Sequence, residues 1–173
     1  MSSLTPQASP MTVRPIEAAQ TYALRHAVLW PNEPLSYVQL PDDIAGHHFG
    51  AFIDPKIDRD VNNDSKNDSG SDDRRDDCGS GELVSIISLF IDEKSGEARF
   101  RKFATAPDWQ GRGVGSALLA HTIEAAATKG ATSIWCDARQ SALGFYRRFG
   151  MSGEGEVFFK GNVPYLRMSK ALP

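Results

Sequence analysis

Three alternating glycines stand in a short turn after a strand-like run, and their spacing suits the binding of a phosphate group. Glycine lets backbone N–H groups face outward in conformations that side chains obstruct. A helix that begins directly after the turn adds the positive end of its dipole, and an arginine within the turn can add a charge-assisted hydrogen bond. The turn and the helix start comprise Gln110, Gly111, Arg112, Gly113, Val114, Gly115 and Ser116.

This turn fits neither of two common nucleotide-binding motifs. A Walker loop needs Gly-Lys-Ser or Gly-Lys-Thr after four spacer residues, and the sequence contains neither. The dinucleotide fingerprint needs a third glycine where this chain has Ser116. The turn alone therefore predicts an anionic, phosphate-bearing ligand and leaves nucleotide and coenzyme A open. A tight turn without a ligand is the remaining alternative.

A second chemical pattern lies on a helix-like segment further along the chain. Residues 142–151 read Ala-Leu-Gly-Phe-Tyr-Arg-Arg-Phe-Gly-Met. With the glycine turn, this segment resembles the GNAT superfamily of N-acetyltransferases, whose cofactor loop has the form Gln/Arg-x-x-Gly-x-Gly/Ala and whose later helix has the form Ala-x-x-Phe-Tyr-x-x-x-Gly-Phe. Gln110, Gly113 and Gly115 match the first element. The two elements occur in the family's order, separated by one helix and one strand.

The resemblance covers residues 12–170; it is strong over residues 100–151 and only architectural before residue 81. One position departs from the family's pattern. Many relatives carry asparagine seven residues before the tyrosine, where this chain has Arg139. We therefore expect Arg139 beside the cofactor, in place of the family's asparagine.

The resemblance implies a single-domain α/β fold: a mixed, twisted sheet of six or seven strands flanked by helices, with parallel central strands splayed to admit acetyl-CoA. Backbone groups of Phe103, Ala104 and Thr105 would pair with the pantetheine arm, and the glycine turn would hold the pyrophosphate. The implied activity is transfer of the acetyl group to an amine, on a small molecule or a protein, by direct attack in a ternary complex. A non-catalytic acyl-CoA sensor is the alternative.

Tyr146 matches the family's usual proton donor to the departing sulfur. A tyrosine with a pKa of ~10 is protonated at neutral pH, whereas a thiol leaves as an anion with a pKa of about 8.5. Full proton transfer is therefore uphill, and Tyr146 would act mainly by hydrogen bonding to the developing charge. The alternative is a packed aromatic side chain beside Phe145 and Phe149.

The base that takes the amine proton is less visible in the sequence. Asp137 is the first candidate because it ends the strand that borders the expected groove, while Glu97, His47 and His48 are weaker candidates. A carboxylate at a strand end also commonly caps the next turn. Cys136 is expected to be an inert buried thiol rather than a nucleophile.

Arg99 and Arg101 alternate with Phe100 on the strand before the turn, so both project to one side. If that side is the acceptor groove, the acceptor carries a carboxylate or phosphate. A solvated strand face is the alternative.

The composition limits the class of protein. The 173 residues carry a formal net charge of −3, without the basic excess that a nucleic-acid or anionic-membrane binder uses. Two cysteines form neither a disulfide framework nor a zinc-site spacing, so we expect no metal and a reducing, cytoplasmic setting. The expected protein is a monomer or homodimer.

An acidic segment divides the chain. Residues 54–81 contain nine Asp, five Lys or Arg and few apolar side chains, which predicts a flexible loop inserted in a hairpin. We expect an N-terminal tail over residues 1–11, the catalytic domain over 12–170 and a C-terminal tail over 171–173.

The hydrophobic periodicity predicts the order strand, helix, several strands, helix, strand, helix and two strands. The strands are expected at residues 12–16, 47–53, 83–91, 98–105, 133–137, 155–160 and 163–170, and the helices at 17–30, 113–129 and about 140–149.

Overall fold

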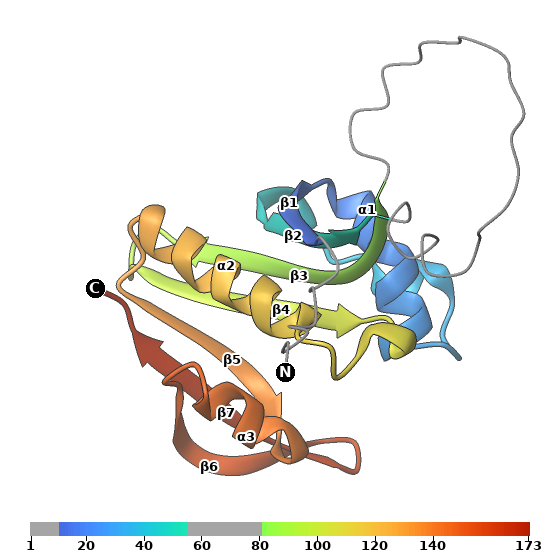
Figure 1. The fold of residues 1–173 in the computed structure, drawn as a ribbon. Coiled ribbons are helices and arrows are strands. Elements are labelled where there is room, and N and C mark those ends of the chain that lie inside the picture. The colour runs from blue at the N-terminus through green and yellow to red at the C-terminus, as the bar shows by residue number, and fades with distance from the viewer. Residues whose placement is uncertain (1–10, 55–80) are drawn as a thin grey trace, which may run out of the picture.

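The computed structural model describes residues 11–54 and 81–173, and within them one seven-stranded sheet runs through the molecule (Figure 1). Its strand order is β1-β2-β3-β4-β5-β7-β6, and only β4 and β5 pair in parallel. This is the mixed sheet that the sequence predicts. The strands are β1 Met11–Ile16, β2 His47–Ile53, β3 Glu82–Asp92, β4 Glu97–Thr105, β5 Ser133–Arg139, β6 Ser152–Lys160 and β7 Val163–Ala171.

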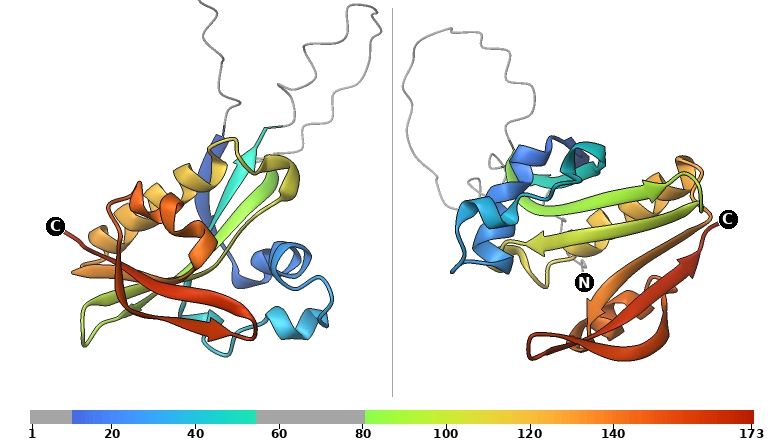
Figure 2. Two further views of the ribbon diagram at one scale, coloured as in Figure 1. Left: turned by 90° about the horizontal axis from the view of Figure 1, so that it is seen from below. Right: turned by 180° about the vertical axis from the view of Figure 1, so that it is seen from behind.

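Helices cover both faces of the sheet. α2 and α3 lie on one face, and α1 with the helical turns after it lies on the other (Figure 2). None of the helices in residues 11–54 and 81–173 is long and apolar enough to cross a membrane. The helical elements are α1 Ala18–Leu24, the π-helix η1 Arg25–Leu29, the 3₁₀ turns η2 Leu35–Val38, η3 Asp43–Ala45, η4 Pro107–Trp109 and η5 Gln140–Ala142, and the α-helices α2 Val114–Thr128 and α3 Leu143–Arg147.

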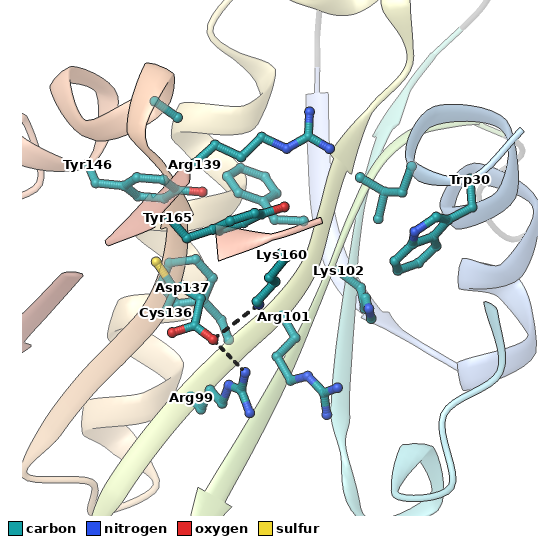
Figure 3. A pocket seen from close by; sticks show the side chains of 14 residues that line it. Trp30, Arg99, Arg101, Lys102, Cys136, Asp137, Arg139, Tyr146, Lys160 and Tyr165 are labelled. Carbon is teal, nitrogen blue, oxygen red and sulfur yellow. Dashed lines mark hydrogen bonds and ion pairs between the residues drawn. The ribbon is translucent and has the colours of Figure 1, made fainter. Parts of the chain in front are cut away.

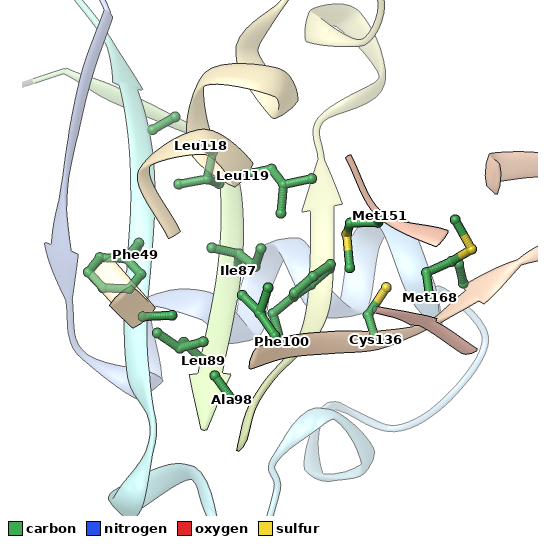
Figure 4. Close-up of a cluster of buried hydrophobic side chains, with 14 of the residues drawn as sticks. Phe49, Ile87, Leu89, Ala98, Phe100, Leu118, Leu119, Cys136, Met151 and Met168 are labelled. Carbon is green, nitrogen blue, oxygen red and sulfur yellow. The ribbon is translucent and has the colours of Figure 1, made fainter. Parts of the chain in front are cut away.

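The hydrophobic core lies between the sheet and α2 (Figure 4). Leu118 and Leu119 of α2 are fully buried, as are Ile87 and Leu89 of β3. Phe100 of β4 is 2% exposed and reaches the same core. Burial of these apolar side chains fixes α2 against the sheet, and with it the turn from which α2 begins.

The two parallel strands separate after a short contact. β4 and β5 pair only at Glu97 with Ser133, Ala98 with Ile134 and Arg99 with Trp135. Beyond Arg99 the strands diverge, as Figure 1 shows. The expected splay of the central strands is therefore present, and residues 100–105 of β4 have no strand partner on that edge.

β4 also contains a β-bulge. Arg101 pairs with Ser88, and Ala104 pairs with Ile86. Two residues of β4, Lys102 and Phe103, therefore lie opposite a single residue of β3, Ile87. Lys102 has φ +54°, the only positive φ of a non-glycine residue in the described chain. A bulge re-aims side chains along a strand, and here it places Lys102 on the same face as Arg101.

Two of the predicted helices differ from the structure. Residues 17–30 were expected to form one α-helix, but α1 ends at Leu24 and continues as η1. Arg25, where the π-helix starts, is tied by its side chain to Asp43 and Ser88, a long-range constraint that helical periodicity does not encode. The helix expected over residues 140–149 is a 3₁₀ turn followed by the short α3.

The remaining boundaries shift by a few residues. β6 begins at Ser152 rather than residue 155, β1 includes Met11 and β7 includes Ala171. Of the predicted acidic loop, residues 55–80 lie outside the described residues, as do residues 1–10 of the predicted tail.

Candidate active site

A cavity of about 400 Å³ opens where β4 and β5 diverge (Figure 3). Residues 99–103 of β4 form one wall, and Cys136, Asp137 and Arg139 of β5 form another. η1 closes the cavity with Leu29 and the adjacent Trp30, while Ala142, Tyr146, Lys160 and Tyr165 complete the lining. Two predicted catalytic residues, Tyr146 and Asp137, are thus brought together with Arg139 in one pocket.

The glycine turn has the backbone geometry of an anion-binding loop. Gly111 and Gly113 have φ of +72° and +82°, the left-handed region that favours glycine, and a Cβ on either would meet open space. None of the N–H groups of residues 111–116 makes a well-formed hydrogen bond to a backbone carbonyl in the described part of the chain. Free donors at the start of a 15-residue helix suit a phosphate group.

The turn is fixed to the end of β4 by two contacts. Gln110 Nε2 donates a hydrogen bond of 3.0 Å to the carbonyl oxygen of Thr105. A Cβ on Gly115 would lie 3.3 Å from both the Phe103 ring and Thr105 Oγ1, so glycine allows α2 to approach β4 closely at this point. The predicted phosphate-binding turn and the predicted pantetheine-binding residues Phe103, Ala104 and Thr105 therefore form one continuous edge.

The side chains of the turn have separate surroundings. Val114 is buried in the core, and the Arg112 guanidinium lies 4.9 Å from the centre of the Trp109 ring. Ser116 lies in the first turn of α2. Val114 can therefore offer a ligand its backbone but not its side chain. The Arg112 side chain is exposed beside the free N–H groups.

The Tyr146 hydroxyl points into the cavity (Figure 3). The Tyr146 ring is held between Phe100 and Phe145, at centroid distances of 5.8 and 5.1 Å. The hydroxyl has no hydrogen-bond partner within the described residues. Burial, and to a lesser extent the neighbouring Cys136, raises the pKa of Tyr146 above its ordinary value of 10.0. Tyr146 is therefore protonated at neutral pH and free to donate, and it is a weaker acid than a solvated tyrosine.

Asp137 lies among cations. Its Oδ2 accepts hydrogen bonds from Arg99 Nη2 at 3.0 Å and from Lys160 Nζ at 3.2 Å (Figure 3). Its buried Oδ1 has Arg167 Nε at 3.9 Å, beyond hydrogen-bond distance, and no hydrogen-bond partner. Three cations therefore surround the Asp137 carboxyl group at the wall of the cavity.

The weaker candidates lie outside the cavity lining. His48 is buried beneath η3, where Nδ1 meets Ser88 Oγ and Nε2 meets the Asp43 carbonyl oxygen, each at 2.8 Å. Glu97 and His47 are exposed on their strands. Cys136 reaches the cavity, but burial raises the pKa of its thiol to about 12, as expected for an inert thiol.

Several cavity residues were not among the predicted catalytic or cofactor-binding residues, although the first helix and the last hairpin were expected to build the substrate pocket. No role was predicted for Lys102, because only the bulge turns it toward the cavity. Trp30, Lys160 and Tyr165 come from distant segments that carry no motif. One local signal was available: strand alternation places Lys102 on the buried face with Phe100, where a lysine is out of place unless the strand bulges.

The divergent parallel strands, the free N–H groups and the cavity between them define an acyl-CoA-dependent acyltransferase. Residues 29–151 match the profile of the Acetyltransferase (GNAT) family, and the chain belongs to this family. It is an enzyme of the N-acetyltransferase class, with an amine as the acceptor. No group of three or more His, Cys, Asp or Glu residues in the described ranges could hold a metal ion.

Known proteins support this assignment. The chain is similar to the uncharacterized N-acetyltransferase YitI of Bacillus subtilis (strain 168), with 26% identity over 156 residues, 86% of this chain and 87% of that protein. A putative N-acetyltransferase from Lactobacillus plantarum has the same fold, with a TM-score of 0.70, 19% identity and coverage of 94% of this chain and 99% of that one. A putative acyl-CoA N-acyltransferase from Klebsiella pneumoniae also has this fold, with a TM-score of 0.65 and 18% identity. The match covers 95% of this chain and 99% of that one.

Proposed function

We propose that the protein transfers an acetyl group from acetyl-CoA to an amine by direct attack in a ternary complex. The observation that carries this proposal is the continuous path from the free N–H groups of residues 111–116, along the unpaired edge of β4, to the Tyr146 hydroxyl. The path combines a phosphate site, an extended groove and a proton donor, the three features that an acyl thioester of coenzyme A requires.

Three parts of the cofactor, the pyrophosphate, the pantetheine arm and the acetyl end, have a matching partner. The pyrophosphate binds the N–H groups of the glycine turn, with Arg112 adding charge, and the pantetheine arm pairs with the backbone of Phe103, Ala104 and Thr105. Arg139, exposed at the end of β5, lies on the rim of the cavity that receives the acetyl end.

The cytoplasmic location and the monomeric or dimeric state of the protein stay predictions.

The reaction needs no covalent enzyme intermediate. The amine nitrogen attacks the thioester carbonyl, the C–N bond forms, and the C–S bond breaks as the tetrahedral intermediate collapses. Tyr146 donates a hydrogen bond to the departing sulfur, and the amine loses one proton to Asp137 or to water. Holding both reactants in one cavity makes the attack effectively unimolecular, which lowers the barrier by up to about 7–11 kcal/mol.

Cofactor selectivity is the first test. In thermal unfolding, acetyl-CoA and CoA at about 100-fold their dissociation constants are expected to stabilise the protein by about 2.7 kcal/mol. NAD and ATP serve as controls and are expected to give no comparable shift, because the chain lacks their motifs. Release of free thiol from acetyl-CoA with a panel of amines then separates an enzyme from a sensor. Absence of a shift with both CoA forms would contradict the proposal.

Gly113→Ala is expected to weaken acetyl-CoA binding about 5- to 30-fold. A side chain destabilises the left-handed conformation by roughly 1–2 kcal/mol, so the free variant relaxes its turn and binding must restore it. Isothermal titration measures the change.

Gly130→Ala is the matched control for that variant. Gly130 follows the other end of α2, has φ +86° and also has open space where a Cβ would lie. Its replacement should cost similar stability and leave acetyl-CoA affinity unchanged. Equal affinity losses in the two variants would mean that the turn does not hold the cofactor.

A further inference from the structure

The cavity at the acceptor end carries an excess of positive charge. Its lining contains five basic side chains and a single carboxylate, that of Asp137. A cavity built for a polyamine would show the opposite balance. The basic residues are Arg99, Arg101, Lys102, Arg139 and Lys160.

Only part of this charge is neutralised. Arg99 and Lys160 share the Asp137 carboxylate, and Arg101 Nη1 lies 3.2 Å from Asp42 Oδ2 at the exposed rim. Lys102 and Arg139 have no carboxylate partner among residues 11–54 and 81–173. The two unpaired cations are the groups most available to an anion.

Lys102 is the more constrained of the two. Its half-buried side chain places Nζ 3.9 Å from the centre of the Trp30 ring, on the η1 face of the sheet. Burial, followed by the nearby cations Arg101, Arg25, Lys160 and Arg99, lowers the pKa of Lys102 to about 8. The four side chains whose charges lower this pKa are all positive. Like charges gathered without a counterion are unfavourable, and a bound anion would relieve the repulsion.

The position of Lys102 separates it from the cofactor path. Phe103, its neighbour in the bulge, faces α2 and lies beside Gly115 of the phosphate turn. Lys102 faces the other side of the sheet, toward Trp30 (Figure 3). The CoA phosphates therefore have their own donors at the turn, and the charge of Lys102 remains for the second substrate.

We propose that the acceptor is a small amine that carries a carboxylate, and that Lys102 binds this carboxylate while Asp137 receives the amine. The proposal rests on the acetyl transfer proposed above and names the substrate class of that site. Lys102 itself has a strained backbone, with φ +54° in a non-glycine residue. Such strain is kept where the surrounding structure and function require it.

Matched acceptor pairs test the substrate class. Thiol release from acetyl-CoA is measured with the common α-amino acids and β-alanine, each beside its primary amide, with aminomethylphosphonate for a phosphate-type anion and spermidine for a polycation. The acid of the best pair is expected to exceed its amide about 10- to 100-fold in kcat/KM, because the amide cannot form the charge-assisted bond to Lys102. A preference for the phosphonate over every carboxylate would overturn the carboxylate assignment.

Variants at Lys102 test the residue itself. Lys102→Gln is expected to lower kcat/KM for the acid at least tenfold and to bring the acid-to-amide ratio close to one, whereas Lys102→Arg retains the preference. The affinity for acetyl-CoA should be unchanged in both. Lys129→Gln, which removes an exposed lysine at the end of α2, is the matched control and should alter none of these quantities.

Binding measurements keep the two proposals separable. Thermal shifts with each acid and amide, with and without CoA, report acceptor binding even where turnover is slow. If acetyl-CoA binds but amides or spermidine are preferred, or acids and amides do not differ, the substrate class is wrong and the proposed function stands. If acetyl-CoA fails to bind, the proposed function itself is wrong, whatever the acids do.

Discussion

A Tyr146→Phe variant should turn over roughly 10²-fold more slowly than the unsubstituted protein at saturating acetyl-CoA and acceptor. The substitution keeps the ring between Phe100 and Phe145 and removes only the hydroxyl that points into the cavity. The lost hydrogen bond acts on the sulfur as negative charge develops there, so it stabilises the transition state more than the bound substrates. The measurement is kcat from thiol release.

The KM for acetyl-CoA separates this role from a structural one. Because the hydroxyl acts on the leaving group, KM should change little while kcat falls. Tyr37→Phe, which removes the hydroxyl of a tyrosine that is 55% exposed, is the control and should be neutral. An unchanged kcat in Tyr146→Phe across the whole pH range would show that Tyr146 is only a packed aromatic side chain.

The pH profile follows from the burial of Tyr146. Its pKa lies above 10.0, so the phenol stays protonated through the neutral range. Any rise of kcat between pH 6 and 9 must therefore come from deprotonation of the amine or the base, and it should persist in Tyr146→Phe at the lower rate. The raised pKa also makes complete proton transfer to a thiolate unfavourable, which favours hydrogen bonding over transfer.

Local sequence patterns are the source of the proposed cofactor-binding residues. The glycine turn, the helix behind it and the aromatic segment around Tyr146 are each encoded within one short continuous segment of the chain. Their chemistry depends on backbone conformation and on one helix, so spacing alone locates them. The splayed strands followed from the resemblance, and the pairing that stops at Arg99 confirms them.

The acceptor side depends on contacts between distant segments, which spacing does not encode. Asp137 was predicted as a base from its place at a strand end, but Lys160 and Arg167 come from the last hairpin to surround it. Lys102 enters the cavity only through a register shift between β3 and β4. In both cases the electrostatic environment is set by tertiary pairing, and a sequence reading supplies the residue types without their partners.

The wall that carries Trp30 is held by a buried polar network. Arg25, which is fully buried, pairs through Nη1 and Nη2 with both carboxylate oxygens of Asp43 at 2.8 Å. Arg25 also donates to the Val38 carbonyl oxygen and to Ser88 Oγ, each at 2.8 Å. Since Arg25 opens the π-helix that ends beside Trp30, this network links the fold of the first helix to the acceptor cavity.

Asp43→Asn is expected to lower the free energy of unfolding by about 3–5 kcal/mol, because it leaves the Arg25 charge buried without its counterion. Urea denaturation measures the loss. The neighbouring Asp42→Asn is the matched control: Asp42 pairs with Arg101 at the exposed rim, and breaking such a pair costs about 0–1 kcal/mol. Equal losses in the two variants would contradict a structural role for the buried pair.

The dependence of this stability on pH has a defined sign. Burial alone would raise the pKa of the Asp43 carboxyl, but hydrogen bonds from Arg25 and the Leu40 N–H, with the Arg25 charge, hold it below its ordinary value of 3.8. A carboxyl whose pKa is lower in the folded state stabilises the protein above the unfolded pKa and loses that contribution as pH falls through the folded value. Below pH 3.8 the unsubstituted protein should therefore lose the stabilising contribution of the Asp43 carboxylate, which the Asp43→Asn variant does not have. The urea midpoints of the two proteins should converge as the pH is lowered. Because the same carboxylate fixes η1, we also expect Asp43→Asn at neutral pH to raise the KM for the acceptor while leaving the affinity for acetyl-CoA unchanged.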